Sequence, residues 1–236
     1  MSIFVKKDDQ RLDVKDITYP SESLKIKAHY ARPKGDEKLP GVVVISEIWG
    51  LVPHIEDITR RVALEGFLAL APDPLTHLGG TPEDPDEAVK LMRGLDPAKT
   101  TMNLVAAAKY LKTHHQSTGK VGVTGFCWGG GMTNQVAVNS HDVQAAVPFY
   151  GRQPESEDVP QIKASIQAHY AGEDERINAG IPEFEAALRK ASVEHEIHVY
   201  DGARHGFMNN TKDWYNEGAA KLAWKRMITF FKEKLK

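Results

Sequence analysis

The chain has 236 residues and a formal net charge of −2, with 41% hydrophobic and 26% charged residues. This balance is typical of a soluble globular protein and provides no basic surface for nucleic acid, so we expect no nucleic-acid partner. No apolar run approaches the roughly 18 residues that span a bilayer, and Met1 to Gln10 lack the apolar core of a signal peptide. The single cysteine excludes an intrachain disulfide. We therefore expect a cytoplasmic protein with no membrane partner, folded as one domain over residues 1–236.

Short apolar runs alternate with segments of helical spacing along the chain. The expected strands lie at 41–46, 67–71, 120–124, 143–149, 162–170 and 194–200, after a strand pair within 16–32 that turns near Pro20. Three helices are expected: one that contains Ile55, Ile58 and Val62, one that begins at Asp96-Pro97, and a last one with Ala220 to Phe231 on one face. This alternation predicts an α/β fold, a mostly parallel central sheet with helices on both faces. Active sites of such folds lie at the carboxyl ends of the strands.

A nucleophile motif follows the strand expected at 120–124. Residues 125–129 read GFCWG and two further glycines follow, which is the G-x-nucleophile-x-G elbow with cysteine in place of serine. The flanking glycines let neighbouring backbone pass close to a strained turn. Because a helix begins at the elbow, we expect its amides and dipole to lower the pKa of the Cys127 thiol and to stabilise an oxyanion.

Two other interpretations of this segment are weaker. A free cysteine is often a small buried apolar residue, but Cys127 is the only cysteine and occupies the one position where the motif needs a nucleophile. The run TGFCWGGG at 124–131 also fits the TGxxxGxG pattern of short-chain dehydrogenases. In that family the pattern follows the first strand, whereas here at least two strand–helix units precede it. The order of elements therefore disfavours a dinucleotide cofactor.

Candidate partners of the nucleophile lie in two loops at the same sheet edge. The loop AGEDERI at 171–177 follows the strand expected at 162–170, and DGARHGF at 201–207 follows the strand expected at 194–200. In this fold the order along the chain is nucleophile, acid, histidine, so His205 is the expected base. A carboxylate that fixes the imidazole tautomer lets it exchange a proton with sulfur. The spacing leaves Glu173, Asp174 and Glu175 open as the acid, and we choose Asp174.

The remaining histidines give no sign of a metal centre. His195 and His198 lie on one expected strand, where the two-residue period sends their side chains to opposite faces. The sequence has no HExxH motif and no cysteine pair. We therefore predict no metal site.

The motifs resemble those of the dienelactone hydrolase family, also called carboxymethylenebutenolidases, from about residue 20 to the final helix. This resemblance implies an α/β-hydrolase fold. It also implies that Cys127 in GFCWGG is the nucleophile, Asp174 the acid and His205 the histidine of a catalytic triad.

The resemblance extends to the loop SEIWG at 46–50. It implies that Glu47 reaches the nucleophile and takes its proton when substrate binds. The backbone amides of Ile48 and Trp128 correspond to the oxyanion hole, and Trp49 corresponds to an aromatic residue that lines the substrate pocket.

The resulting hypothesis is a hydrolase of a small-molecule ester or lactone that forms a thioester on Cys127 and needs no cofactor. The alternative from another class is a non-catalytic protein of hydrolase fold that binds a small molecule in the same pocket. A thiol redox role is weaker, because the chain has no resolving cysteine.

One departure from the family bears on the substrate. The family holds the substrate carboxylate with arginines, one of them four residues after the catalytic histidine, where this chain has Asn209. The loop at 73–80, which corresponds to the other position, also lacks arginine. A charged carboxylate that enters a partly desolvated pocket needs a charged partner. We therefore expect neutral esters or lactones to be better substrates than carboxylate-bearing dienelactones, unless Arg152 or Arg204 supplies the contact.

Overall fold

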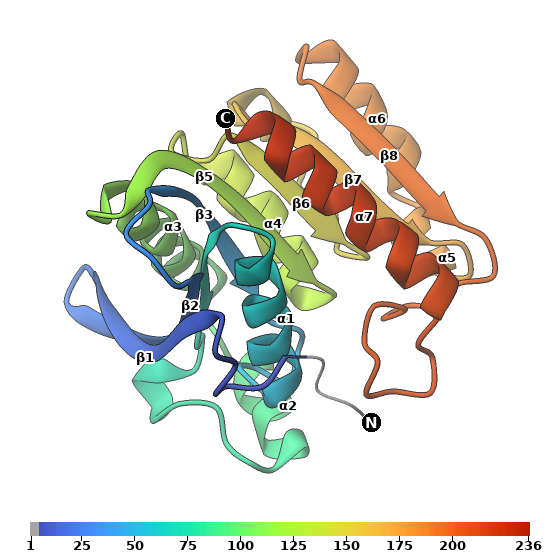
Figure 1. The fold of residues 1–236 in the computed structure, drawn as a ribbon. Helices are drawn as coiled ribbons and strands as arrows, with labels where there is room; N and C mark the ends of the chain where they lie inside the picture. Colours follow the sequence, from blue (N-terminus) through green and yellow to red (C-terminus); the bar gives the residue numbers. More distant parts are fainter. Residues whose placement is uncertain (1–4) are drawn as a thin grey trace.

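A computed structural model describes residues 5–236, and its centre is one eight-stranded sheet (Figure 1). The strand order is β1-β2-β4-β3-β5-β6-β7-β8. The pairs β1–β2 and β2–β4 are antiparallel, and the other five pairs are parallel. The strands are β1 (Leu12–Ser21), β2 (Leu24–Pro33), β3 (Leu39–Ile45), β4 (Leu68–Pro72), β5 (Ser117–Phe126), β6 (Ala145–Phe149), β7 (Ser165–Ala171) and β8 (His195–Tyr200).

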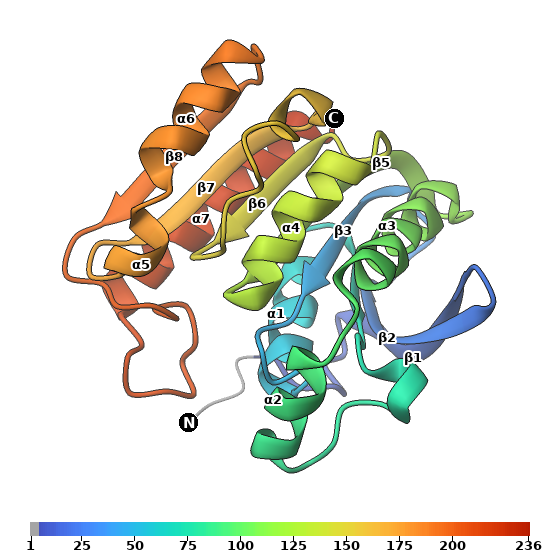
Figure 2. The ribbon, with the colours of Figure 1, turned by 180° about the vertical axis from the view of Figure 1, so that it is seen from behind.

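Helices cover the sheet on both sides, which confirms the predicted α/β fold. Helices α1 and α7 lie on the face seen in Figure 1, and α3, α4 and α6 lie on the opposite face seen in Figure 2. The α-helices are α1 (Pro53–Leu64), α2 (Pro85–Arg93), α3 (Pro97–Thr113), α4 (Trp128–Asn139), α5 (Glu175–Asn178), α6 (Ile181–Lys190) and α7 (Glu217–Lys234).

The central strands are buried on both faces because each face packs against its own helices. Val42 and Val44 of β3 belong to the hydrophobic core that includes α1 and α7. Their neighbours Val43 and Ile45 belong to the core that includes α3, α4 and α6. Successive side chains of a strand point to opposite faces, so a continuous apolar run such as GVVVI serves both cores.

The structure differs from the sequence prediction at several element ends. The hairpin begins at Leu12 rather than near residue 16, and β7 begins at Ser165, after a short 3-10 helix at Val159–Gln161. Helix α2 was not predicted, although it begins with the same Asp-Pro signal as α3. The Asp84 side chain accepts hydrogen bonds from the amides of Asp86 and Glu87 there.

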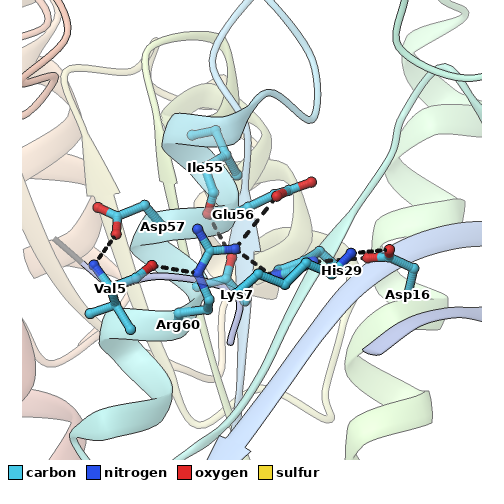
Figure 3. A network of polar contacts seen from close by, with 9 residues as sticks. Val5, Lys7, Asp16, His29, Ile55, Glu56, Asp57 and Arg60 are labelled. Atoms are coloured by element: carbon cyan, nitrogen blue, oxygen red, sulfur yellow. Dashed lines mark hydrogen bonds and ion pairs between the residues drawn. The ribbon is translucent and has the colours of Figure 1, made fainter. Parts of the chain in front are cut away.

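A polar network around the buried side chains of Arg60 and His29 joins the start of the described chain to α1 and β2, as Figure 3 shows. Arg60, which is 2% exposed, donates from Nε to the carbonyl oxygen of Val5 at 2.7 Å and from Nη1 toward His29 Nε2 at 3.1 Å and Glu56 at 3.5 Å. His29 Nδ1 lies 2.9 Å from an oxygen of Asp16. We call Val5, Asp16, His29, Glu56 and Arg60 the Arg60 network.

The partners within the Arg60 network fix the protonation state of its histidine. A guanidinium only donates, so His29 must accept at Nε2 and carry its proton on Nδ1, which faces Asp16. Burial and the positive charge of Arg60 lower the pKa of His29, against the opposing effect of Asp16. His29 is therefore a neutral structural residue.

Within residues 5–236, no helix combines the length and the apolar character needed to cross a membrane.

Candidate active site

The four predicted catalytic side chains all lie just beyond the carboxyl ends of parallel strands. Glu47 follows β3 and Cys127 follows β5, at the centre of the sheet. Asp174 follows β7 and His205 follows β8, the last two strands in the sheet order. Because these strands are parallel, their carboxyl ends meet at one side of the sheet. The fold thus places these four residues, which are far apart in sequence, at the carboxyl ends of the strands.

Cys127 occupies a strained turn between β5 and α4. Its backbone has φ 56° and ψ −115°, a conformation that costs energy for a residue with a side chain. Its amide donates to the carbonyl oxygen of Phe149 at 3.0 Å, and its carbonyl accepts from the amide of Gly131 at 3.1 Å. A Cβ atom at Gly125 would overlap the backbone of Gly129, so the first glycine of the motif is sterically required.

His205 and Asp174 are in direct contact. His205 Nδ1 forms a short hydrogen bond with Asp174 Oδ2. The other oxygen of Asp174 accepts from the amide of Ile177 at 3.4 Å, which holds the carboxylate at the start of α5. Asp174 is buried, whereas both neighbouring carboxylates that the spacing left open, Glu173 and Glu175, are exposed. Of the three candidates, Asp174 is the one that contacts the imidazole.

Glu47 is buried and receives a hydrogen bond from Asn209. Glu47 is 2% exposed, and its Oε2 accepts a hydrogen bond from Asn209 Nδ2. Asn209 Oδ1 accepts from the amide of Thr211 at 3.0 Å and from its hydroxyl at 2.6 Å. Those two donors orient the amide group of Asn209 so that its nitrogen faces Glu47. Asn209 therefore positions the carboxyl group of Glu47.

The two central groups have shifted pKa values. Burial raises the pKa of Glu47 to about 7, against the opposing effects of Asn209 and Lys212. Burial and the nearby Glu47 raise the pKa of the Cys127 thiol to about 11, although the Trp128 amide lowers it in part. The sequence prediction of a lowered thiol pKa is therefore wrong. Desolvation disfavours the thiolate more than the first amide of the helix favours it, so the thiol of the free enzyme is neutral at pH 7.

A cavity of about 370 Å³ opens beside Cys127. It is lined by Pro97, Cys127, Trp128, Gly131, Met132, Gln135, Arg152, Gln153 and Glu155. Of the predicted substrate-binding residues, Trp128 lines this cavity, whereas Ile48 and Trp49 do not. Trp49 instead stacks on Trp214 with ring centroids 6.5 Å apart.

Sequence analysis missed two neighbours of the catalytic groups. The Tyr150 ring packs edge-on against His205, with centroids 5.1 Å apart, and Tyr150 has a strained φ of 36°. The signal was available, because Tyr150 comes directly after the carboxyl end of β6. Lys212 lies with Nζ 4.4 Å from the centre of the Trp49 ring. It sits in a loop without a motif, so nothing in the sequence pointed to it.

Among the described residues, no group of three or more histidine, cysteine, aspartate and glutamate side chains is arranged to hold a metal ion.

Comparisons with known proteins agree with this fold. A protein of Saccharolobus solfataricus with the name "Putative carboxymethylenebutenolidase" is 35% identical, over 92% of this chain and 98% of the relative. The crystal structure of a "Putative Dienelactone Hydrolase" from Klebsiella pneumoniae superposes with a TM-score of 0.85 at 30% identity, over 94% of this chain and 99% of the other. A dienelactone hydrolase from Anabaena variabilis, at 20% identity and a TM-score of 0.75 over 96% of this chain and 100% of that one, shares the fold.

The model of the "Dienelactone hydrolase family" matches residues 26–235, which is nearly the whole chain. Together with the α/β-hydrolase sheet and the relatives that span the same length, this match shows that the chain belongs to the dienelactone hydrolase family.

Proposed function

We propose that this protein hydrolyses an ester or lactone with Cys127 as nucleophile, Glu47 as the base that activates it, and His205 and Asp174 as the acid–base pair. The observation that carries the proposal is a buried carboxyl group, Glu47, close enough to the neutral thiol of Cys127 for its charge to act on it. The pKa of Cys127 is about 11 and that of Glu47 about 7. A thiol of this kind needs a base, and a carboxylate with a raised pKa is a stronger base than an exposed one.

In the first half of the reaction, a bound ester places its carbonyl carbon at the Cys127 sulfur. The Glu47 carboxylate takes the thiol proton and the sulfur attacks the carbonyl carbon. The backbone amides of Ile48 and Trp128 donate to the oxyanion. His205 begins this step as an imidazolium, with one proton on Nδ1 facing Asp174 and one on its free nitrogen. The carbon–oxygen bond of the ester then breaks, and His205 gives the proton on its free nitrogen to the leaving alkoxide. A thioester and an alcohol result, while Glu47 is protonated and His205 neutral.

In the second half, water hydrolyses the thioester. Neutral His205 takes a proton from the water, whose oxygen attacks the thioester carbon, and Asp174 stabilises the imidazolium that forms. The carbon–sulfur bond breaks and releases the acid. The Cys127 thiolate recovers its proton from Glu47, which returns every group to its starting state. A lactone follows the same steps and opens without losing a fragment.

The test is the release of nitrophenol from para-nitrophenyl acetate. Cys127→Ala should lower kcat by about 10³-fold or more, because the nucleophile is lost. Asp174→Asn should also impair turnover strongly, whereas its exposed neighbour Glu173→Gln is the matched control and should change kcat by less than about twofold. Hydrolysis that survives Cys127→Ala would contradict the proposal, and a loss with Glu173→Gln but not with Asp174→Asn would overturn the choice of acid.

A further inference from the structure

Arg32 is a buried cation that forms no ion pair with the described carboxylates, although Asp13 lies opposite it on β1. Arg32 is 3% exposed and lies at the end of β2. Its Nε donates to the carbonyl oxygen of Pro33 at 2.8 Å and its Nη2 to that of Glu37 at 3.1 Å. Its Nη1 is buried with no hydrogen-bond partner, and no carboxylate of residues 5–236 forms an ion pair with Arg32.

Burial of an arginine on neutral carbonyl groups alone leaves most of its desolvation cost uncompensated. Buried charges in proteins are normally paired or hydrogen-bonded at every donor. Arg60 shows the satisfied case in the same chain, with a carbonyl, an imidazole and a carboxylate around one guanidinium. Arg32 has two carbonyls and one unused donor, so an anion beside it would be stabilised.

A cavity of about 420 Å³ lies next to Arg32, within the size range of small-molecule sites. It is lined by Asp13, Lys15, Ile17, Tyr30, Arg32, Gly35, Asp36, Tyr110, His114, His115 and Gln116. These residues come from the β1–β2 hairpin, the loop after it and the end of α3, which lie together in Figure 2.

Aromatic rings form much of the wall. The ring centroid of His114 lies 5.7 Å from that of Tyr30, 5.8 Å from that of Tyr110 and 4.4 Å from that of His115. The buried hydroxyl of Tyr30 also has no hydrogen-bond partner. A planar apolar ring packs favourably against such a surface.

The cavity lies near the amino-terminal end of β5, whereas the candidate active site lies at the carboxyl end of that strand. Gln116 directly precedes β5, whereas Cys127 directly follows it. At about 3.3 Å per residue, the length of this strand separates the two positions by roughly 30 Å. A ligand in the cavity is therefore not a substrate placed at the Cys127 sulfur.

We propose that this cavity is a second ligand site, which binds a small aromatic monocarboxylate. The carboxylate forms the ion pair that Arg32 lacks, with Lys15 at the exposed rim, and the ring of the ligand packs against Tyr30 and His114. The carboxylates of Asp13 and Asp36 line the same cavity and repel negative charge. Arg32 and Lys15 offset this repulsion for one ligand carboxylate, and a second carboxylate has no further cation to pair with.

The test measures binding of 4-fluorobenzoate to the full chain by ¹⁹F NMR, with 4-fluorobenzyl alcohol as the neutral probe and 4-fluorophthalate as the dianion. The monoanion should bind at least about tenfold more tightly than the alcohol, and more tightly than the dianion. Equal binding of the alcohol and the monoanion would overturn the proposal.

Variants locate the site. Arg32→Met should weaken 4-fluorobenzoate binding by at least about tenfold, with hydrolysis of a nitrophenyl ester retained as evidence of folding. Lys15→Met, an exposed change that leaves the fold intact, should weaken binding about two- to fivefold. Lys25→Met lies on the same hairpin outside the cavity and should have no effect. Binding that is the same in Lys15→Met and Lys25→Met, or that disappears in Cys127→Ala, would place the ligand elsewhere and contradict the proposal.

Discussion

The Arg60 network and the candidate active site are both polar clusters with a buried ionisable group, His29 in one and Glu47 in the other, but the protonation of these two groups is controlled differently. In the Arg60 network, the guanidinium of Arg60 fixes the tautomer of His29, and burial lowers the pKa of its imidazole, so His29 stays neutral. In the candidate active site, Glu47 has one amide donor, and burial brings its pKa to about 7. The adjacent thiol of Cys127 is pushed further from ionisation by the same carboxylate.

The difference separates a buried group that serves stability from one that serves chemistry. A fully partnered cluster stabilises one arrangement, so its loss weakens the fold. A cluster whose groups titrate near neutral pH, at a cleft and at the carboxyl ends of strands, can accept and release protons. Two single substitutions should therefore affect stability and activity in opposite ways.

The largest expected effect on stability comes from Arg60→Met. The change leaves the carbonyl of Val5 and Nε2 of His29 without their donor in the protein interior. The free energy of unfolding should fall by about 3 to 5 kcal/mol, while kcat/KM of the folded enzyme should change by less than about twofold. Chemical denaturation and steady-state kinetics check both numbers. The exposed Arg93→Met is the control and should change neither. A large loss of kcat in folded Arg60→Met would break the comparison.

Glu47→Gln should have the opposite pattern, lower activity with higher stability at alkaline pH. Burial raises the folded-state pKa to about 7 from an ordinary value of 4.5. The stability that this group contributes is fully present below pH 4.5 and is lost as the pH rises through about 7, because the carboxylate must then be buried. At pH 8, Glu47→Gln should therefore raise the free energy of unfolding by about 2 to 3 kcal/mol, and at pH 4 by almost nothing.

The same variant tests the proposed base. In the wild type, kcat/KM for a nitrophenyl ester should rise with pH through about 7, as Glu47 ionises. Glu47→Gln should lower kcat/KM and remove this rise. A pH profile that is unchanged in Glu47→Gln would show that Glu47 does not take the thiol proton.

A smaller effect concerns the charge of the substrate. Asn209, which replaces the expected arginine, is already hydrogen-bonded to Glu47, and Arg152 at the wall of the Cys127 cavity is paired with Glu155 at 3.1 Å. The methyl ester of a dienelactone should therefore be hydrolysed with a kcat/KM about ten- to a hundredfold above that of the free acid. A preference for the free acid that disappears in Arg152→Ala would identify Arg152 as its partner and reverse this expectation.

The sequence predicted the fold and the positions of the catalytic candidates well, because both depend on local signals. Apolar runs mark the buried strands, and the elbow glycines are required by backbone approaches within a few residues of Cys127. The order of the loops then placed Asp174 and His205 at the same edge. The choice among Glu173, Asp174 and Glu175 needed the structure, since only burial and the contact with His205 separate them.

The electrostatics of the site could not be predicted, because they depend on tertiary burial. The dipole of α4 is visible in the sequence, but the desolvation of Cys127 and its neighbour Glu47, 80 positions earlier, are not. The hydrogen bond from Asn209 to Glu47 spans 162 positions. In the sequence, Asn209 was noted only because the family has an arginine at this position. In the structure, Asn209 positions the carboxyl group of Glu47.

The central claim is that Glu47 activates Cys127 for attack on the ester, whereas His205 is needed for hydrolysis of the thioester that results. The most direct test is mass spectrometry of the His205→Ala variant, quenched during incubation with para-nitrophenyl acetate. Nitrophenolate leaves without a proton donor, so acylation should proceed while hydrolysis of the thioester stalls. The account predicts one acetyl group on the peptide that carries Cys127, formed in His205→Ala and absent in the double variant with Cys127→Ala. An acetyl group on another residue, or no adduct in His205→Ala while nitrophenol is still released, would contradict it.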